Sequence, residues 1–141
     1  MRADSIADAA KVAKAAEEAQ AAMKTTLLVP ITFDSESTAV RFDASAPLDH
    51  KVPILLANPT LSLRITGHAY EAASAPANVA LGLARAESAK QYMVIQGVAA
   101  NRIQTAGHAD QKPAGAVDDS LAAMRSAEFE ITSAPPTLQN P

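Results

Sequence analysis

Two histidines lie in identical Gly-His-Ala triplets, at residues 67–69 and 107–109, where metal or general-base chemistry could be sought. A zinc site needs three or four protein ligands, and neither His68 nor His108 has a second histidine at helical spacing. The chain has no cysteine, which excludes thiolate ligands and a cysteine nucleophile. We expect His68 to fill a turn and bond to backbone groups. With no nucleophile–base set or phosphate-binding glycine loop, the sequence predicts no enzyme, no metal and no cofactor.

Arg85, on the long helix predicted in the second half of the chain, could hold an anionic ligand. Its planar guanidinium can hold a carboxylate through two hydrogen bonds, and the free N–H groups of a helix starting near residues 76–79 would attract the same anion. As a rim residue of such a site, Arg85 would contribute little to folding. The alternatives are a surface charge of the helix that pairs with Glu71 and a structural arginine that braces the Gly-His turn.

Charge and composition exclude several classes of partner. The 141 residues have a formal net charge of −3 and no block of Lys or Arg, so a nucleic-acid surface or a lipid-binding basic surface is not expected. No stretch approaches the roughly 18 apolar residues of a membrane span, and no apolar signal region follows Met1. Any membrane attachment would depend on a segment upstream of Met1.

The two ends of the chain predict accessory segments around one domain. Residues 5–23 contain neither Gly nor Pro and are rich in alanine, which predicts a helix. Its larger apolar residues are only Ile6, Val12 and Met23, so we expect residues 1–24 to form a solvated spacer helix whose deletion costs little stability. Residues 133–141 are polar and contain several prolines, which predicts a flexible tail.

Between these ends, residues 25–132 alternate between strand-like and helix-like periods. Apolar alternation and β-branched residues predict strands at 25–33, 60–66, 103–106 and 127–132. Helical spacing predicts a helix at 47–57, which Pro53 should kink or confine to its second half. A long helix follows, entered through Ser74-Ala75-Pro76 and ending at Gly97, and a short one near 120–124. The order β-α-β-α-β-(α)-β predicts an α+β sandwich with helices on one face of a mixed sheet.

The segment around Arg85 also matches a known motif. Residues 67–73, followed by Asn78 to Ala86, resemble without a gap the pattern G-H-T-D-x-x-G-x-x-x-x-N-x-x-L-S-x-x-R-A of the OmpA C-terminal-like peptidoglycan-binding family. The resemblance covers about residues 25–132 and implies the fold of that family. Further matching positions are Phe33-Asp34, Asn58-Pro59, Gly97-Val98, Arg102-Ile103, Gly107 and Pro113.

The resemblance implies a site for diaminopimelate, the residue of uncrosslinked peptidoglycan stem peptides whose side chain ends in an ammonium and a carboxylate. Arg85 would take the carboxylate, and Asn78 would fix the turn and the pocket. Glu36 stands where the family has an Asp. The remaining positions of the candidate site are His68, Ala69, Tyr70 and Leu81.

Tyr70 is the main departure from the family pattern, because it stands where the family has the Asp that binds the ammonium group. Loss of one charge-assisted hydrogen bond costs about 1.5–3 kcal/mol, or roughly ten- to hundredfold in affinity. Tyr70 could instead stack on sugar or peptide, or cover a decayed pocket. Asp34, Glu36 or Glu71 could substitute for the missing carboxylate.

Two functions follow from these residues. The first is a periplasmic, outer-membrane-associated module that binds peptidoglycan noncovalently and anchors an outer-envelope component to the cell wall, weakened by Tyr70. The second is a structural or assembly scaffold of a cell-envelope complex. It would bind envelope proteins through its sheet edge or its alanine-rich helix, with little affinity for peptidoglycan. The sequence leaves both open.

Overall fold

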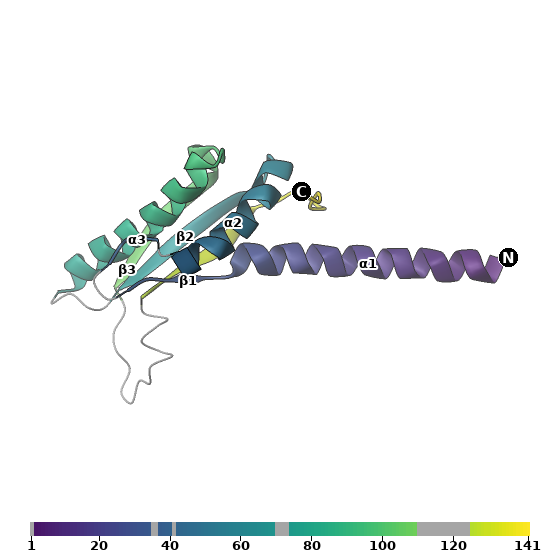
Figure 1. Ribbon diagram of the computed structural model, residues 1–141, viewed down its shortest axis with the longest axis horizontal. Coiled ribbons are helices and arrows are strands. Elements are labelled where there is room, and N and C mark those ends of the chain that lie inside the picture. Colours follow the sequence, from purple (N-terminus) through teal and green to yellow (C-terminus); the bar gives the residue numbers. More distant parts are fainter. Residues whose placement is uncertain (1, 35–36, 41, 70–73, 110–124) are drawn as a thin grey trace, which may run out of the picture.

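The computed structural model describes residues 2–34, 37–40, 42–69, 74–109 and 125–141. Figure 1 shows a body of helices packed on a sheet, from which the N-terminal part of one long helix extends away. The described elements are α1 (Arg2–Leu28), β1 (Ile31–Thr32), α2 (Phe42–Ala57), β2 (Ser62–Ala69), α3 (Ala75–Ile95), the 3-10 helix η1 (Ala100–Arg102), β3 (Ile103–Ala109) and β4 (Ser126–Ser133). The short helix predicted near 120–124 falls outside the described residues.

The sheet has the strand order β1-β4-β2-β3. The β2–β3 pair is parallel, whereas β4 runs antiparallel to both β1 and β2. This arrangement confirms the predicted α+β fold with a mixed sheet.

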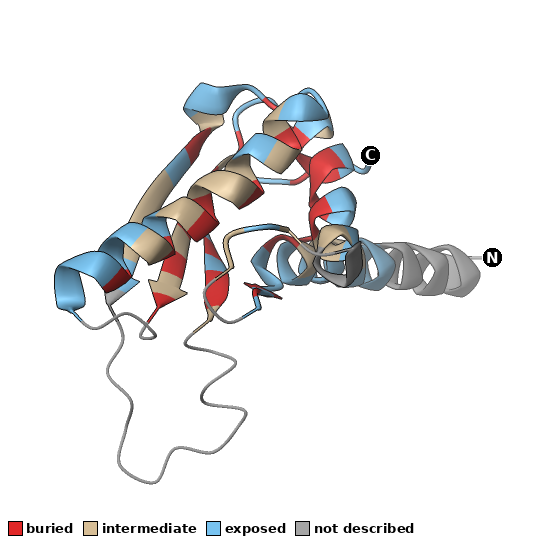
Figure 2. Ribbon diagram, turned by 60° about the vertical axis from the view of Figure 1, so that its left-hand side comes forward, coloured by how far each residue is buried: buried red, intermediate tan, exposed pale blue. Residues whose placement is uncertain are grey.

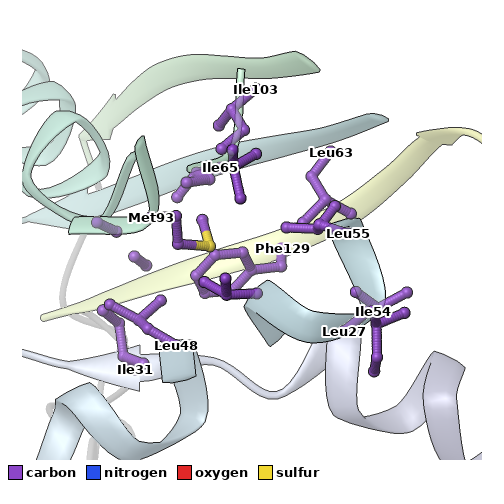
Figure 3. Close-up of a cluster of buried hydrophobic side chains, with 14 of the residues drawn as sticks. Leu27, Ile31, Leu48, Ile54, Leu55, Leu63, Ile65, Met93, Ile103 and Phe129 are labelled. Carbon is purple, nitrogen blue, oxygen red and sulfur yellow. The ribbon is translucent and has the colours of Figure 1, made fainter. Parts of the chain in front are cut away.

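The hydrophobic core lies between one face of the sheet and the helices. Because strand side chains alternate between faces, Leu63 and Ile65 of β2 point to the same side, where they join Phe129 of β4. Residues from all three α-helices complete the same cluster, and Figure 3 shows them converging on Phe129. Figure 2 shows buried residues gathered where the helices meet the strands. The prediction that the helices cover one face is confirmed. The helical members of the cluster include Met23, Leu27, Leu48, Val52, Leu55, Ala86, Ala89 and Met93.

Three glycines bring the backbone of α3 against the sheet. Gly67 and Gly107 are register partners on β2 and β3. A Cβ atom on Gly67 would collide with the carbonyl of Gly82 in α3, and one on Gly107 would collide with the carbonyl of Val79. The close approach therefore depends on the missing side chains.

The ends of α3 follow the sequence prediction. The Ser74 side chain accepts a hydrogen bond from the Ala77 N–H as the N-cap, and Pro76 lies in the first turn. At the other end, Gly97 has a φ of 112°, and the Val98 N–H donates to the Met93 carbonyl. This is the αL stop expected at Gly97.

The prediction for α2 is wrong in its extent. The helix begins at Phe42 and contains both Pro47 and Pro53. Each proline removes one backbone donor, but Leu48 and Leu55 are fully buried on one stripe while Pro53 lies on the exposed side. Burial of this stripe outweighs the local cost of the prolines, so the helix continues through them.

The strand predicted at 25–33 is also wrong over most of its length. Residues 25–28 belong to α1, and β1 spans only Ile31–Thr32. Met23 and Leu27 are one helical turn apart, and both are buried. Their burial stabilises a helix rather than a strand in this part of the chain. Pro30 lies just after the end of α1, and a proline at this position cannot continue the helix. The last turns of α1 are therefore docked on the body, although residues 13–18 are exposed.

Lys51 of α2 joins the end of α1 to the core. Its side chain is completely buried, and its Nζ donates to the carbonyls of Thr26 at 2.9 Å and Val29 at 2.7 Å. The same atom lies 4.4 Å from the centre of the Phe129 ring, a cation–π contact. Burial lowers the pKa of Lys51 from 10.5 to about 8.

The C-terminal segment is held at one point rather than flexible throughout. Leu138 is only 3 % exposed and belongs to the core cluster. Side-chain amides of Gln20 and Asn58 hydrogen-bond to the backbone of Leu138 and Gln139. A polar, proline-containing composition does not reveal that one leucine is buried.

Two truncations should separate the free and docked parts of α1. Removing residues 1–18 should leave the free energy of unfolding nearly unchanged, since residues 13–18 are exposed. Removing residues 1–24 also removes buried Met23 and the Gln20 contacts, and should cost about 2–5 kcal/mol. Urea unfolding of both shortened chains checks this, and equal stability of the two would contradict it.

The buried Lys51 should make stability rise with pH in alkaline solution. Between pH 8 and 10.5 the folded protein holds Lys51 largely neutral while the unfolded chain still binds the proton, so the free energy of unfolding increases with pH. From pH 7.5 to 10 the gain from this residue should be about 2 kcal/mol. Urea unfolding of the unchanged chain and of Lys51→Met at both pH values isolates the contribution. The same pH dependence in both proteins would contradict it.

Candidate functional site

Arg85 lies at the junction of three chain segments. It follows Gly82 by three residues on α3, so it emerges on the face of the helix that touches the sheet. Its Nε donates to the Ser37 carbonyl at 2.9 Å, and its two terminal nitrogens donate to the carbonyls of His68 at 2.9 Å and Asp34 at 3.2 Å. Arg85 thus joins α3 to the end of β2 and to the chain that follows β1.

The expectation that Arg85 is a rim residue is wrong. The side chain is completely buried, and the guanidinium carbon lies 5.6 Å from the centre of the Phe33 ring. The family motif gives the position of this arginine in the sequence, but it does not give the carbonyls that surround the side chain. A buried guanidinium with three backbone acceptors has a structural role, whatever else it does.

Asn78 and Leu81 lie on α3 before Arg85. Asn78 is 6 % exposed, and its N–H donates to the Ser74 carbonyl at 3.0 Å in the first turn of the helix. Asn78, Gly82 and Arg85 recur at helical spacing on the face toward the sheet, and Leu81 is partly buried beside them. Ala69, at the end of β2, is fully buried. The structure therefore places four of the predicted residues around the C-terminal end of β2 and the first half of α3.

The side chain of His68 is directed away from these residues. His68 lies within β2 rather than in a turn, and it shares the strand face of Arg64 and Thr66, opposite the core. Its Nε2 is 3.4 Å from Glu128 Oε2, and its ring centre is 5.3 Å from that of His108 on the neighbouring strand. Only the carbonyl of His68 reaches Arg85. Within the described part of the chain, no group of three His, Asp or Glu residues is arranged to hold a metal.

Tyr70 and Glu36, the remaining predicted residues, lie outside the described residues. Their positions in the chain are nevertheless informative. The three carbonyls that Arg85 binds belong to Asp34, Ser37 and His68, which come just before or after residues 35–36 and 70–73. Arg85 therefore fixes the backbone beside both candidate positions.

Lys51, which is buried, and Arg102, which is partly buried, have roles that the sequence analysis did not predict. Lys51 was described above. Arg102 donates to the carbonyls of Leu55, Asn58 and Leu61, and so ties η1 to the end of α2, while burial lowers its pKa. Lys51 falls three residues after Leu48 and four before Leu55, on the buried stripe of α2. That spacing is the signal that could have predicted its burial.

Fold and motif together define an OmpA-like domain. The family model described as "OmpA family" matches residues 32–125, and the chain belongs to this family. Peptidoglycan-associated lipoproteins are similar in sequence: the one from Rhizobium meliloti is 39 % identical over 89 residues, which cover 63 % of this chain and 51 % of that protein. The one from Agrobacterium fabrum is 35 % identical, with 63 % and 50 % covered. The chain spans about half the length of these relatives.

Solved structures show the same fold. The peptidoglycan-associated lipoprotein from Burkholderia pseudomallei gives a TM-score of 0.67 at 24 % identity, over 73 % of this chain and 89 % of that one. The cell wall anchor of the T6SS from Pseudomonas aeruginosa gives 0.60 at 24 % identity, over 77 % and 81 %. Among the described residues, no helix is both long and apolar enough to cross a membrane.

Replacing Arg85 should destabilise the fold rather than only weaken a site. Arg85→Ala leaves three carbonyls without their donor and should lower the free energy of unfolding by more than about 3 kcal/mol, while Arg85→Lys should recover part of the loss. Arg64→Ala is the matched control, because Arg64 is exposed and contacts surface Glu130; its cost should stay below about 1 kcal/mol. Chemical denaturation measures all three, and similar losses for Arg85→Ala and Arg64→Ala would contradict the prediction.

Proposed function

We propose that this OmpA-family domain binds peptidoglycan noncovalently, and that it holds a component of the outer envelope to the cell wall from the periplasmic side of the outer membrane. Its relatives are named peptidoglycan-associated lipoproteins, and a structural neighbour is described as a cell wall anchor. The observation that carries the proposal in this chain is the gathering of Ala69, Asn78, Leu81 and Arg85 at one end of β2. The domain acts by binding and not by catalysis.

The proposed ligand is the diaminopimelate of an uncrosslinked stem peptide, bound where β2 ends and α3 begins. The positive end of the α3 dipole would favour the ligand carboxylate. Because Arg85 is buried and bound to three carbonyls, we assign it the positioning of the chain beside residues 36 and 70. Direct contact with the ligand then falls to Asn78, Leu81, Glu36 and Tyr70.

The affinity of this site is expected to be low because of Tyr70. The ammonium end of diaminopimelate would meet a neutral hydroxyl in place of a carboxylate, which gives a weaker hydrogen bond. Glu36 could supply part of the missing charge. The proposal is therefore a cell-wall module with reduced affinity for its ligand.

A structural scaffold in an envelope complex is the second candidate function, and the burial of Arg85 favours it. An arginine with no exposed surface stabilises the fold without requiring a ligand. Co-sedimentation of the chain with purified peptidoglycan sacculi separates the two functions. Retention with the sacculi supports the first, and its absence at high protein concentration supports the scaffold.

The sharper test introduces a carboxylate at residue 70. Tyr70→Asp should raise the affinity for a diaminopimelate-containing stem peptide about tenfold or more, since it adds one charge-assisted hydrogen bond. The gain should shrink as salt rises if the new pair is partly exposed. Calorimetric titration of the unchanged chain and the variant measures both effects.

Ala100→Asp is the matched control for that titration. Ala100 is exposed in η1, just before β3 begins. The substitution therefore adds the same charge as Tyr70→Asp, but at the other end of the sheet. No gain for Tyr70→Asp, or an equal gain for Ala100→Asp, would count against a diaminopimelate pocket at this position and in favour of the scaffold.

A further inference from the structure

The chain binds its own C-terminal segment through two side-chain amides. The Gln20 amide donates to the Leu138 carbonyl at 2.7 Å and accepts from the Leu138 N–H at 2.8 Å. The Asn58 amide makes the same pair of bonds with Gln139, at 3.0 and 2.7 Å. Two consecutive residues thus have both of their backbone polar groups bound by side chains of α1 and of the end of α2.

Between the two amides, a single side chain is buried. Leu138 is 3 % exposed, whereas residues 136–137 and 139–141 are exposed. Leu138 belongs to the core cluster that contains Met23 of α1 and Ile54 of α2. Asn58 is itself fixed, because it is 2 % exposed and its amide also donates to the Ile54 carbonyl at 2.8 Å. The residues that bind the tail are therefore held in place by the rest of the fold and not by the tail alone.

This combination is the chemistry of peptide recognition. An amide that binds both the N–H and the C=O of one residue recognises an extended backbone whatever side chain that residue has. The edge of a sheet binds a peptide strand in the same way. Selectivity then comes from the pocket that takes the leucine. The arrangement lies where β2 begins and where Ser62 pairs with Ser133, away from the end of β2 at Ala69.

We propose that the junction of α1 and α2 is a recognition site for an extended, leucine-containing peptide, which residues 138–139 fill in this chain and which a partner polypeptide can occupy in their place. Only four residues, 134–137, connect Ser133 to Leu138, so the tethered tail has an effective concentration in the millimolar range. A partner segment must bind tightly enough to compete with the tethered tail at this effective concentration, or the tail must first dissociate. The site is independent of the proposed peptidoglycan function.

A variant of the 141-residue chain with a weakened tail tests the site. In Leu138→Ala the pocket loses its occupant, and a labelled peptide Ala-Pro-Pro-Thr-Leu-Gln-Asn-Pro, which copies residues 134–141, should bind saturably in fluorescence anisotropy. The same peptide with Ala in place of Leu should bind about 10- to 100-fold more weakly, because the buried leucine is missing. Adding Asn58→Ala to the variant should also weaken binding.

Leu56→Ala is the matched control, because Leu56 is an exposed leucine of α2 and its loss leaves the tail in place. That variant should bind the labelled peptide much more weakly than Leu138→Ala does. If Leu138→Ala does not fold, Leu138→Val, which removes one methylene, replaces it. Absence of binding to a folded Leu138 variant, or equal binding of the two peptides, would overturn the proposal. Sacculus binding by the same variant reports separately on the peptidoglycan function.

Discussion

The contact between the backbone of α3 and the sheet is the constraint on which the rest of this domain depends. Gly67, Gly82 and Gly107 allow a helix and two parallel strands to approach without intervening side chains. Because α3 lies so close, Arg85 can reach the His68 carbonyl and the chain after β1 at the same time. A side chain at any of the three glycines would move the helix outward and would break these hydrogen bonds before it disturbed the core farther away.

Three cations, two of them buried and one partly buried, donate to backbone carbonyls at the ends of elements. Such groups need donors when they leave water, and here Lys51, Arg85 and Arg102 supply them. Each cation bonds to carbonyls that belong to other elements, so each also fixes how those elements meet. Long side chains suit a chain with only 4 % aromatic residues, since their alkyl stems fill space that larger apolar groups would fill elsewhere. For Lys51 and Arg85, burial of the charge makes the carbonyl partners obligatory.

The sequence predicts the features of this fold that repeat along the chain. Alternation and helical spacing give the mixed sheet and the helices on one face, the N-cap and the stop of α3 follow from Ser74, Pro76 and Gly97, and motif spacing identifies the family. The failures involve single long-range partners. The sequence of Thr25 to Leu28 is typical of a strand, but contacts with Lys51 and the core stabilise a helix there. The burial of Leu138 depends on Gln20 and Asn58, which are far away in sequence. Similarly, the position of Arg85 is predictable, but its carbonyl partners are not.

The contacts that hold α1 lie apart from the candidate ligand site. Met23 and Leu27 pack in the core, Lys51 binds the carbonyls at the end of the helix, and Gln20 joins the helix to Leu138. Arg85 and Asn78 lie near the C-terminal end of β2, on the other side of the shared core. If an envelope component is attached through α1, tension on that helix acts first on Gln20, Met23 and the Lys51 hydrogen bonds. The glycine contact and Arg85 would then remain in place until the end of α1 separates from α2, so that such tension reaches the candidate ligand site last.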